Sequence, residues 1–285
     1  MITVTVAPPF ATIQDLGRTG YRDSGVPVSG VADRDSALTL NSMLGNQHGA
    51  AMMEWAIAGG ALRFDTGCTV AVGGAVAECF VNGKAMNPFV PVEVGAGGEL
   101  RVDRIVGGRF LLVAVRGGIN VPVVMGSRST LLSAALGGLE GRRLRNGDTL
   151  LIGDAFASPN GMTRTFVHAA PSGTIGVIRG PQAHLFDEHA WTTFLNADLS
   201  VSRASDRTGY RLEGIEIRHN GDATLPSEPT CVGAIQIPGG GAPIVIMNDG
   251  PTVGGYPKIA VIRTSCLSRF AQLAPGEKVR FALDE

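Results

Sequence analysis

Gly250-Pro251-Thr252-Val253-Gly254-Gly255-Tyr256-Pro257 is the most informative stretch of this chain. It follows a strand-like apolar run, residues 243–247, and an acid, Asp249. Glycine tolerates backbone angles that other residues avoid, and proline fixes φ, so this stretch constrains the backbone rather than filling a core. Such a turn can present N–H groups to an anion or a carbonyl. Taken alone, a tight structural loop is the simpler interpretation.

Two distant segments share a second pattern. Residues 18–22 and 207–211 both read Arg-Thr-Gly-Tyr-Arg, and an acid closely precedes each copy, Asp15 in the first and Asp206 in the second. Two copies of a polar, glycine-containing element suggest related halves or two edges of one cleft. Coincidence in a chain with 40 glycines is the alternative.

Length and composition indicate a globular protein of about two domains, because the chain has 285 residues. Hydrophobic residues make up 44% and charged residues 17%, which is enough apolar material for a sizeable core. The net charge of -1 gives no electrostatic case for nucleic acid or an acidic membrane. No apolar run approaches the roughly 20 residues of a membrane helix, and the start lacks signal-peptide features. We therefore expect a cytoplasmic protein.

The sequence does not predict a metal site or a P-loop. The four cysteines lie in apolar or strand-like surroundings without a Cys-x-x-Cys pair, which suggests buried free thiols, and no His-Glu-x-x-His is present. The pattern Gly-x-x-x-x-Gly-Lys-[Ser/Thr] is missing. If ATP is used, we do not expect this chain to bind it in the P-loop manner.

Short β-branched runs between glycine and proline turns predict a mainly β chain, with α+β character from minor helices. The predicted strands are Leu62–Phe64, Val70–Val72, Val90–Val94, Leu100–Ile105, Phe110–Val115, Thr149–Ile152, Thr174–Ile178, Ile215–Ile217, Ile244–Met247, Ile259–Ile262 and Val279–Leu283. The turn at Gly239-Gly240-Gly241 is interpreted as a hairpin, with a phosphate cradle as the alternative.

Helix signals are few. Asp33 can cap a helix that runs to Leu44 and stops at Gly45. A second candidate covers 185–195, and shorter pieces are expected at 129–136 and 265–273. Turn dipeptides in 153–173 mark a boundary. We predict an N-terminal β domain at 1–155 with one capped helix, a linker at 156–173, and a C-terminal β-barrel domain at 174–285.

Several motifs, in order along almost the whole chain, resemble the allophanate hydrolase subunit 2 family, also called the biotin-dependent carboxyltransferase family. They are Gln14–Arg18, Gly25–Gly30 with Asp33, Arg116–Ile119, Gly126–Thr130, Ser205–Gly214 and Gly254–Pro257. The family includes the C-type subunit of the bacterial 5-oxoprolinase.

The resemblance implies a cyclophilin-like β-barrel architecture in two related halves. It implies a hydrolase subunit active only in a hetero-oligomeric complex with a B-type subunit and an A-type subunit as partners, which opens 5-oxo-L-proline to L-glutamate with consumption of ATP. The alternatives are a carboxyltransferase or allophanate-hydrolase-type subunit in urea metabolism, or a non-catalytic partner that sequesters a kinase inhibitor resembling the B-type subunit. An Ala-Met-Lys-Met attachment site is missing, so any biotin would come from a partner.

Opening a lactam or moving a carboxylate requires an oxyanion donor, a cation for the substrate and a group that moves a proton. The catalytic candidates are the acids and tyrosines of the motifs: Asp15, Asp206, Asp249, Tyr210 and Tyr256. The substrate-binding candidates are Gln14, Arg18, Arg116, Gly117, Gly118, Arg207, Gly254 and Gly255. Each alone is explained as well by a structural role; as a set they predict one cleft, on which 15–18, 206–207 and 249–257 converge.

Overall fold

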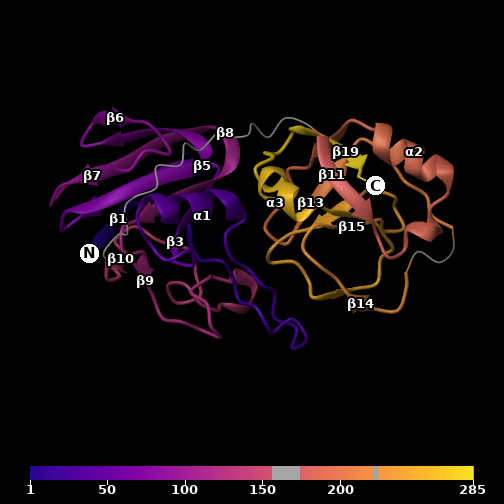
Figure 1. The fold of residues 1–285 in the computed structure, drawn as a ribbon, viewed down its shortest axis with the longest axis horizontal. Coiled ribbons are helices and arrows are strands. Elements are labelled where there is room, and N and C mark those ends of the chain that lie inside the picture. The colour runs from indigo at the N-terminus through magenta and orange to yellow at the C-terminus, as the bar shows by residue number, and fades with distance from the viewer. Residues whose placement is uncertain (156–173, 221–223, 285) are drawn as a thin grey trace. The chain divides into compact units, whose positions relative to one another are not determined.

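The computed structural model describes residues 1–155, 174–220 and 224–284, and the chain forms two compact units (Figure 1). The first unit comprises Met1–Thr19 and Ser29–Ala169, and the second comprises Gly20–Val28 and Ala170–Glu285. The predicted linker at 156–173 lies outside the described residues. The sequence-based boundaries also placed Gly20–Val28 in the first domain. In the structure this segment joins the second unit, where Arg22 donates to the carbonyl of Thr230 at 2.8 Å.

The first unit contains a ten-stranded sheet whose main path runs β2-β3-β8-β4-β1-β10-β9, with β5 joined to β6, β7 and β8. All of its pairings are antiparallel. The strands are β1 (Ile2–Val6), β2 (Thr12–Gln14), β3 (Met52–Ala56), β4 (Ala58–Phe64), β5 (Cys68–Val81), β6 (Lys84–Met86), β7 (Val92–Val94), β8 (Glu99–Val115), β9 (Ile119–Asn120) and β10 (Thr149–Ile152).

Two strands that the sequence predicted separately in this unit form one continuous strand. Leu100–Ile105 and Phe110–Val115 merge into β8, which continues through Gly107-Gly108 for 17 residues. Its partner β5 is 14 residues long, and the pairing shifts register near Gly74 and Val76. The glycines therefore mark irregular pairing within a long bent ladder and do not end the strand.

Helix α1 (Arg34–Met43) confirms the helix predicted to start at an Asp33 cap and to stop at Gly45. The side chain of Asp33 accepts a hydrogen bond from the Ser36 N–H at 3.0 Å, and Gly45 has a φ of 67°. Leu40 is fully buried and packs in one cluster with Ala71 of β5 and Leu112 of β8. The helix thus covers part of the sheet (Figure 1).

The second unit is built around a closed barrel in the order β11-β18-β15-β16-β13-β12-β19. Among the described residues of this barrel, only β11 and β19 pair in parallel. The elements are β11 (Thr174–Arg179), α2 (Glu188–Asn196), β12 (Leu199–Val201), β13 (Gly209–Glu213), β14 (Glu228–Pro229), β15 (Ala234–Gln236), β16 (Ile244–Ile246), β17 (Val253–Gly254), β18 (Lys258–Ile262), α3 (Thr264–Ala271) and β19 (Lys278–Leu283), with 3-10 turns at Leu132–Ala134 in the first unit and Ala183–Leu185 here.

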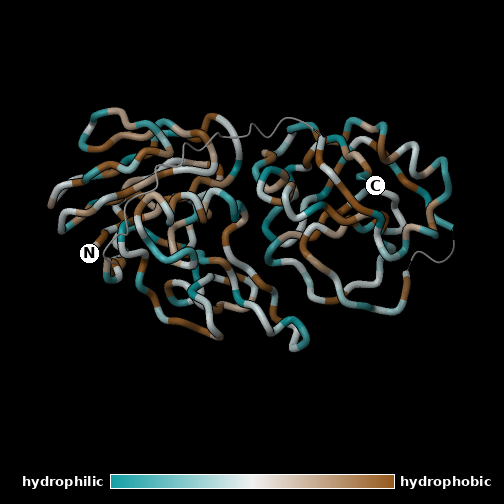
Figure 2. Tube along the Cα trace, in the orientation of Figure 1, coloured by the Kyte–Doolittle hydropathy of each residue, from teal (hydrophilic) through white to brown (hydrophobic). Residues whose placement is uncertain are grey.

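Aromatic side chains fill the core of the second unit. Phe194 of α2 stacks on Phe281 of β19 with ring centroids 5.0 Å apart, and Phe270 lies 5.4 Å from Tyr210. Figure 2 shows hydrophobic stretches alternating with hydrophilic ones along the trace of both units. Burial of the hydrophobic stretches is the main stabilising term of each unit.

The prediction of a mainly β chain with few helices is confirmed. The hairpin at Gly239–Gly241 is also confirmed, because Ile235 of β15 pairs with Val245 of β16. Two local predictions are wrong: 129–136 contains only the 3-10 turn Leu132–Ala134, and Ile215–Ile217 is not a strand. In the described ranges no helix is long and apolar enough to cross a membrane.

Candidate functional site

The loop Gly250–Pro257 joins β16 to β18 in the second unit, and its β17 pairs with β14. A Cβ on Gly250 would lie 2.6 Å from the carbonyl oxygen of Thr208, and one on Gly254 would lie 2.7 Å from Nε2 of Gln236. Neither these two glycines nor Gly255 has a positive φ. These glycines are therefore not required for unusual backbone angles, and that prediction is wrong here; they are required because neighbouring groups approach the backbone closely.

A largely buried ion pair fixes the start of this loop. Nε and Nη2 of Arg207 donate to the two carboxylate oxygens of Asp249 at 2.8 and 2.9 Å, and the two side chains are 14% and 10% exposed. The Asp249 N–H also donates to the Arg207 carbonyl at 2.8 Å. The planar guanidinium fork is therefore engaged by an internal carboxylate, which gives Arg207 and Asp249 a positioning role in this structure.

Asp206 precedes Arg207 in the chain, and its carboxylate stabilises the turn in which it lies. Its Oδ1 accepts from the Thr208 N–H at 2.8 Å and from the Gly209 N–H at 3.3 Å. This is the local side-chain-to-backbone bonding that aspartate commonly makes in turns. Two of the three predicted segments, 206–207 and 249–257, are thus brought together.

The middle of the loop is held by Thr230. Its N–H donates to the Thr252 carbonyl at 2.9 Å, and its hydroxyl donates to the Pro251 carbonyl. Nη2 of Arg22 donates to the carbonyl and the hydroxyl oxygen of the same threonine at 2.8 and 3.3 Å. An arginine from the first Arg-Thr-Gly-Tyr-Arg copy therefore supports the glycine-rich loop.

A polar cluster lies where the loop ends, at the first residue of β18. We call Lys258, Glu228, Gln182 and Gln236 the Lys258 cluster. The Lys258 side chain is only 4% exposed, and its ammonium donates to Oε1 of Glu228. Gln182 Nε2 donates to the same oxygen, and Gln182 Oε1 accepts from the Lys258 N–H at 3.2 Å. The hydrogen bond from the Lys258 ammonium lowers the pKa of Glu228, so this carboxyl stays ionised at neutral pH.

Gln236 gives this cluster an unused donor. The residue is 4% exposed, and its Nε2 has no hydrogen-bond partner among the described residues. The backbone of Gly254 lies close against that nitrogen, because a Cβ there would come within 2.7 Å of it. A buried amine with an adjacent amide donor can stabilise negative charge on a carbonyl oxygen or an anion. We therefore take the loop and the Lys258 cluster as the candidate site.

The two candidate tyrosines have different environments. Tyr210 is fully buried, and its hydroxyl donates to the Ala271 carbonyl at 2.6 Å, so it belongs to the barrel core. Tyr256 is 39% exposed at the end of the loop. Of the two, Tyr256 presents its side chain at the surface, whereas a catalytic role for Tyr210 would require the core to open.

The predicted residues near the N-terminus belong to the first unit. Asp15 accepts from the hydroxyls of Ser127 and Ser129 and from the N–H of Gly17 and Arg128, at 2.5–2.8 Å. The fully buried Arg18 donates to the carbonyls of Val124 and Ser129. Gln14 is fully buried and donates to the Thr130 carbonyl. These contacts describe loop anchors; convergence of 15–18 with the loop of the second unit stays a prediction.

The segment Arg116-Gly117-Gly118 lines two cavities of the first unit. Gly117 and Gly118 border one of about 320 Å³ with Asn46 and Arg128, and Arg116 borders another of about 430 Å³ with Cys68. The Gly117 N–H donates to Oδ1 of Asn46 at 2.8 Å, and the Gly118 N–H donates to the Val115 carbonyl at 2.9 Å. The N–H groups of these two substrate-binding candidates are therefore occupied in this structure.

The thiols differ from the sequence interpretation. Cys68 and Cys79 are buried, and burial raises both of their pKa values, that of Cys79 to about 11. Cys231 is exposed and Cys266 is half-buried, so the prediction of four buried thiols is wrong. Within the described ranges no group of three or more His, Cys, Asp or Glu residues is placed to hold a metal ion.

Residues 24–283 match the model of a protein family described as the carboxyltransferase domain, subdomain A and B. The chain belongs to this family. The carboxyltransferase-domain chain is 35% identical to the C-type subunit of 5-oxoprolinase from Escherichia coli (strain K12), over 99% of this chain and 90% of that protein.

Two fungal proteins are also similar. The urea amidolyase of Lachancea kluyveri is 32% identical over 98% of this chain, which spans only 16% of that protein. The crystal structure of the Kluyveromyces lactis urea amidolyase superposes with a TM-score of 0.93 at 30% identity, covering 100% of this chain and 19% of that one. The same fold therefore occurs both in a subunit of about this size and within a much longer chain.

Sequence reasoning missed Lys258, Glu228, Gln182, Gln236 and Arg22. Lys258 directly follows the quoted loop, so its position was the available signal. Glu228, Gln182 and Gln236 lie far from it in sequence and meet it only through barrel closure, which pairs Gln236 with Lys258 across β15 and β18.

Proposed function

We propose that this chain is the C-type subunit of an ATP-dependent 5-oxoprolinase, which opens 5-oxo-L-proline to L-glutamate together with a B-type and an A-type partner subunit. The observation that carries the proposal is the 35% identity to the Escherichia coli protein over 99% of the chain. The Haemophilus influenzae protein of the same name is 31% identical over 99% of the chain and supports the same assignment.

The candidate site fits the needs of this reaction. Ring opening adds water across the lactam C–N bond, and negative charge develops on the carbonyl oxygen when the carbon is attacked. In our proposal the Lys258 ammonium and the Gln236 amide stabilise that charge, and Gly254 lets the loop backbone lie close against the Gln236 amide. Glu228 holds the ammonium in place, and the Arg207–Asp249 pair fixes the loop that leads to it.

A second candidate function is the carboxyltransferase role in urea metabolism. It is favoured by the 32% identity to a urea amidolyase and by the TM-score of 0.93 to another. In that case biotin would be carried by a partner and would reach this chain as a substrate. The first function is preferred because this chain covers 90% of the 5-oxoprolinase protein but only 16% of the urea amidolyase.

The proposal predicts turnover only in the assembled complex. The chain is purified alone and with its B-type and A-type partner subunits, and L-glutamate release from 5-oxo-L-proline is measured with and without ATP. We expect ATP-dependent release by the complex and little or none by the isolated chain. Robust turnover by the isolated chain, or a complex active only on urea with biotinylated protein, contradicts the proposal.

A further inference from the structure

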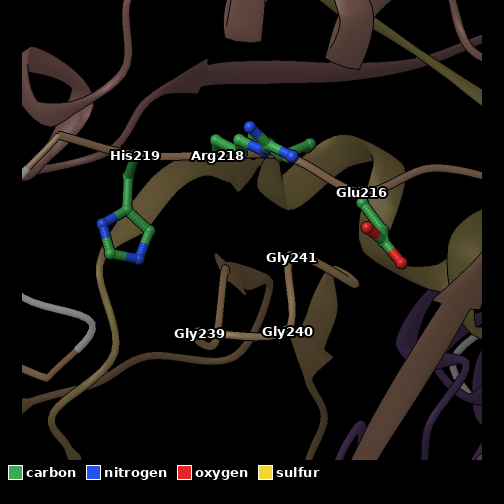
Figure 3. Close-up of a pocket in the computed structure, with 7 residues that line it drawn as sticks. Glu216, Arg218, His219, Gly239, Gly240 and Gly241 are labelled. Atoms are coloured by element: carbon green, nitrogen blue, oxygen red, sulfur yellow. The ribbon is translucent and has the colours of Figure 1, made fainter.

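A cavity lies in the barrel unit, between residues 216–219 and the hairpin turn Gly239–Gly241 (Figure 3). Its volume is about 570 Å³, which is enough for a small molecule. The Ile217 N–H donates to the Gly241 carbonyl at 2.9 Å and joins the two walls. The Gly241 N–H donates to the Pro238 carbonyl at 2.8 Å, and Gly241 has a φ of 78°, so the turn is closed by its own backbone.

The lining offers several hydrogen-bond donors. Arg218 is exposed and makes no hydrogen bond or ion pair within the described ranges. The N–H groups of Gly239 and Gly240 likewise have no acceptor among those residues. His219 is half-buried, its ring packs edge-on against Phe186 at 5.9 Å, and its Nδ1 is enclosed without a partner in the part of the chain that is described. A guanidinium with bare amides is a typical oxyanion site.

The lining also carries an acid, Glu216. Figure 3 shows the side chains of Glu216 and His219 at opposite ends of one segment, both extending towards the glycine turn, with Arg218 between them. Glu216 is exposed and has no ion-pair partner among the described residues. A purely anionic ligand would be repelled by this carboxylate, whereas a ligand with a separate ammonium group would use it.

We propose that this cavity binds a small amino acid, with a carboxylate held by Arg218, His219 and the amides of Gly239 and Gly240, and with the ammonium group held by Glu216. The site is separate from the Lys258 cluster in its residues. L-glutamate is the probe of choice, and this choice rests on the proposed function, in which it is the product. Binding is measured on the isolated chain, so its failure is distinguishable from failure of turnover.

Isothermal titration calorimetry with L-glutamate, 5-oxo-L-proline and inorganic phosphate tests the proposal. Arg218→Ala should weaken glutamate binding at least tenfold, since charge-assisted hydrogen bonds are lost. His219→Phe keeps the aromatic packing and should weaken it by a smaller factor. Glu216→Gln should weaken glutamate binding but leave phosphate binding unchanged or stronger. Arg203→Ala, another exposed arginine of this unit outside the cavity lining, is the matched control and should change nothing.

Each alternative result overturns a stated part of the proposal. Equal affinity for 5-oxo-L-proline and glutamate removes the ammonium contact, because the lactam nitrogen carries no charge. Phosphate binding without glutamate binding reduces the site to an oxyanion site and refutes the amino-acid assignment. Absence of all three, or equal losses in Arg203→Ala and Arg218→Ala, refutes the site.

Discussion

The two Arg-Thr-Gly-Tyr-Arg copies are identical in sequence and different in structure. In the first copy Arg18 is fully buried and donates to backbone carbonyls, Gly20 has a φ of 91°, and the segment contains no strand. In the second copy Arg207 pairs with Asp249, and residues 209–211 begin β13. Identical pentapeptides therefore do not make a structural repeat.

What each copy does is set by the residues that it meets. The acid before the first copy, Asp15, gathers two hydroxyls and two amides from other segments and its own turn, whereas the Asp206 carboxylate accepts from the turn that follows it. The first copy ends in Arg22, which reaches Thr230, and the second ends in the exposed Arg211. The shared residue types anchor loops in both copies, but they bind different partner residues.

The largest difference between the copies should appear on removal of these acids. Asp15→Ala leaves the buried Ser127 and Ser129 without their common acceptor and should lower the free energy of unfolding of the first unit by about 3 kcal/mol. Asp206→Ala, in an exposed turn, should cost the second unit about 1 kcal/mol. Urea denaturation followed by tryptophan fluorescence separates them, because Trp55 lies in the first unit and Trp191 in the second. Equal losses would remove the distinction between the copies.

The Arg207–Asp249 pair should behave as a coupled unit. Arg207→Ala leaves a nearly buried carboxylate unpaired and should lower stability by about 2 kcal/mol, and adding Asp249→Ala should cost little more. A double-mutant cycle measures the coupling.

In the assembled complex Arg207→Lys keeps the charge but loses the planar fork, and turnover should fall about tenfold. If the losses of stability in the double-mutant cycle were additive and Arg207→Lys kept full turnover, the pair would not hold the loop.

The smallest expected difference in stability between the two copies concerns their tyrosines, Tyr21 and Tyr210. Tyr210→Phe loses the hydrogen bond to Ala271 and should cost about 1 kcal/mol. Tyr21→Phe, at the matching position of the first copy, should leave stability unchanged, because its hydroxyl has no hydrogen-bond partner among the described residues. Thermal unfolding of both variants checks this, and an equal shift in Tm for the two would contradict the assignment.

Local sequence patterns correctly predicted the elements that local interactions determine. The capped helix α1, the Gly239–Gly241 hairpin and most short strands follow from caps, turns and β-branched runs. The merging of two predicted strands into β8 did not follow, because continued pairing with β5 outweighs the glycines between them. The Lys258 cluster could not be predicted either, since Gln182, Glu228 and Gln236 meet Lys258 only through long-range packing.

Lys258→Met in the assembled complex tests the central claim most directly. The substitution keeps an unbranched side chain of similar length and removes the ammonium, while Glu228 keeps its Gln182 contact and its access to water. We expect ATP-dependent release of L-glutamate to fall at least a hundredfold with the complex intact by size-exclusion chromatography, because the proposed site would lose the positive charge that stabilises the carbonyl oxygen. Unchanged turnover in an intact complex would contradict the assignment of the site to the loop and the Lys258 cluster.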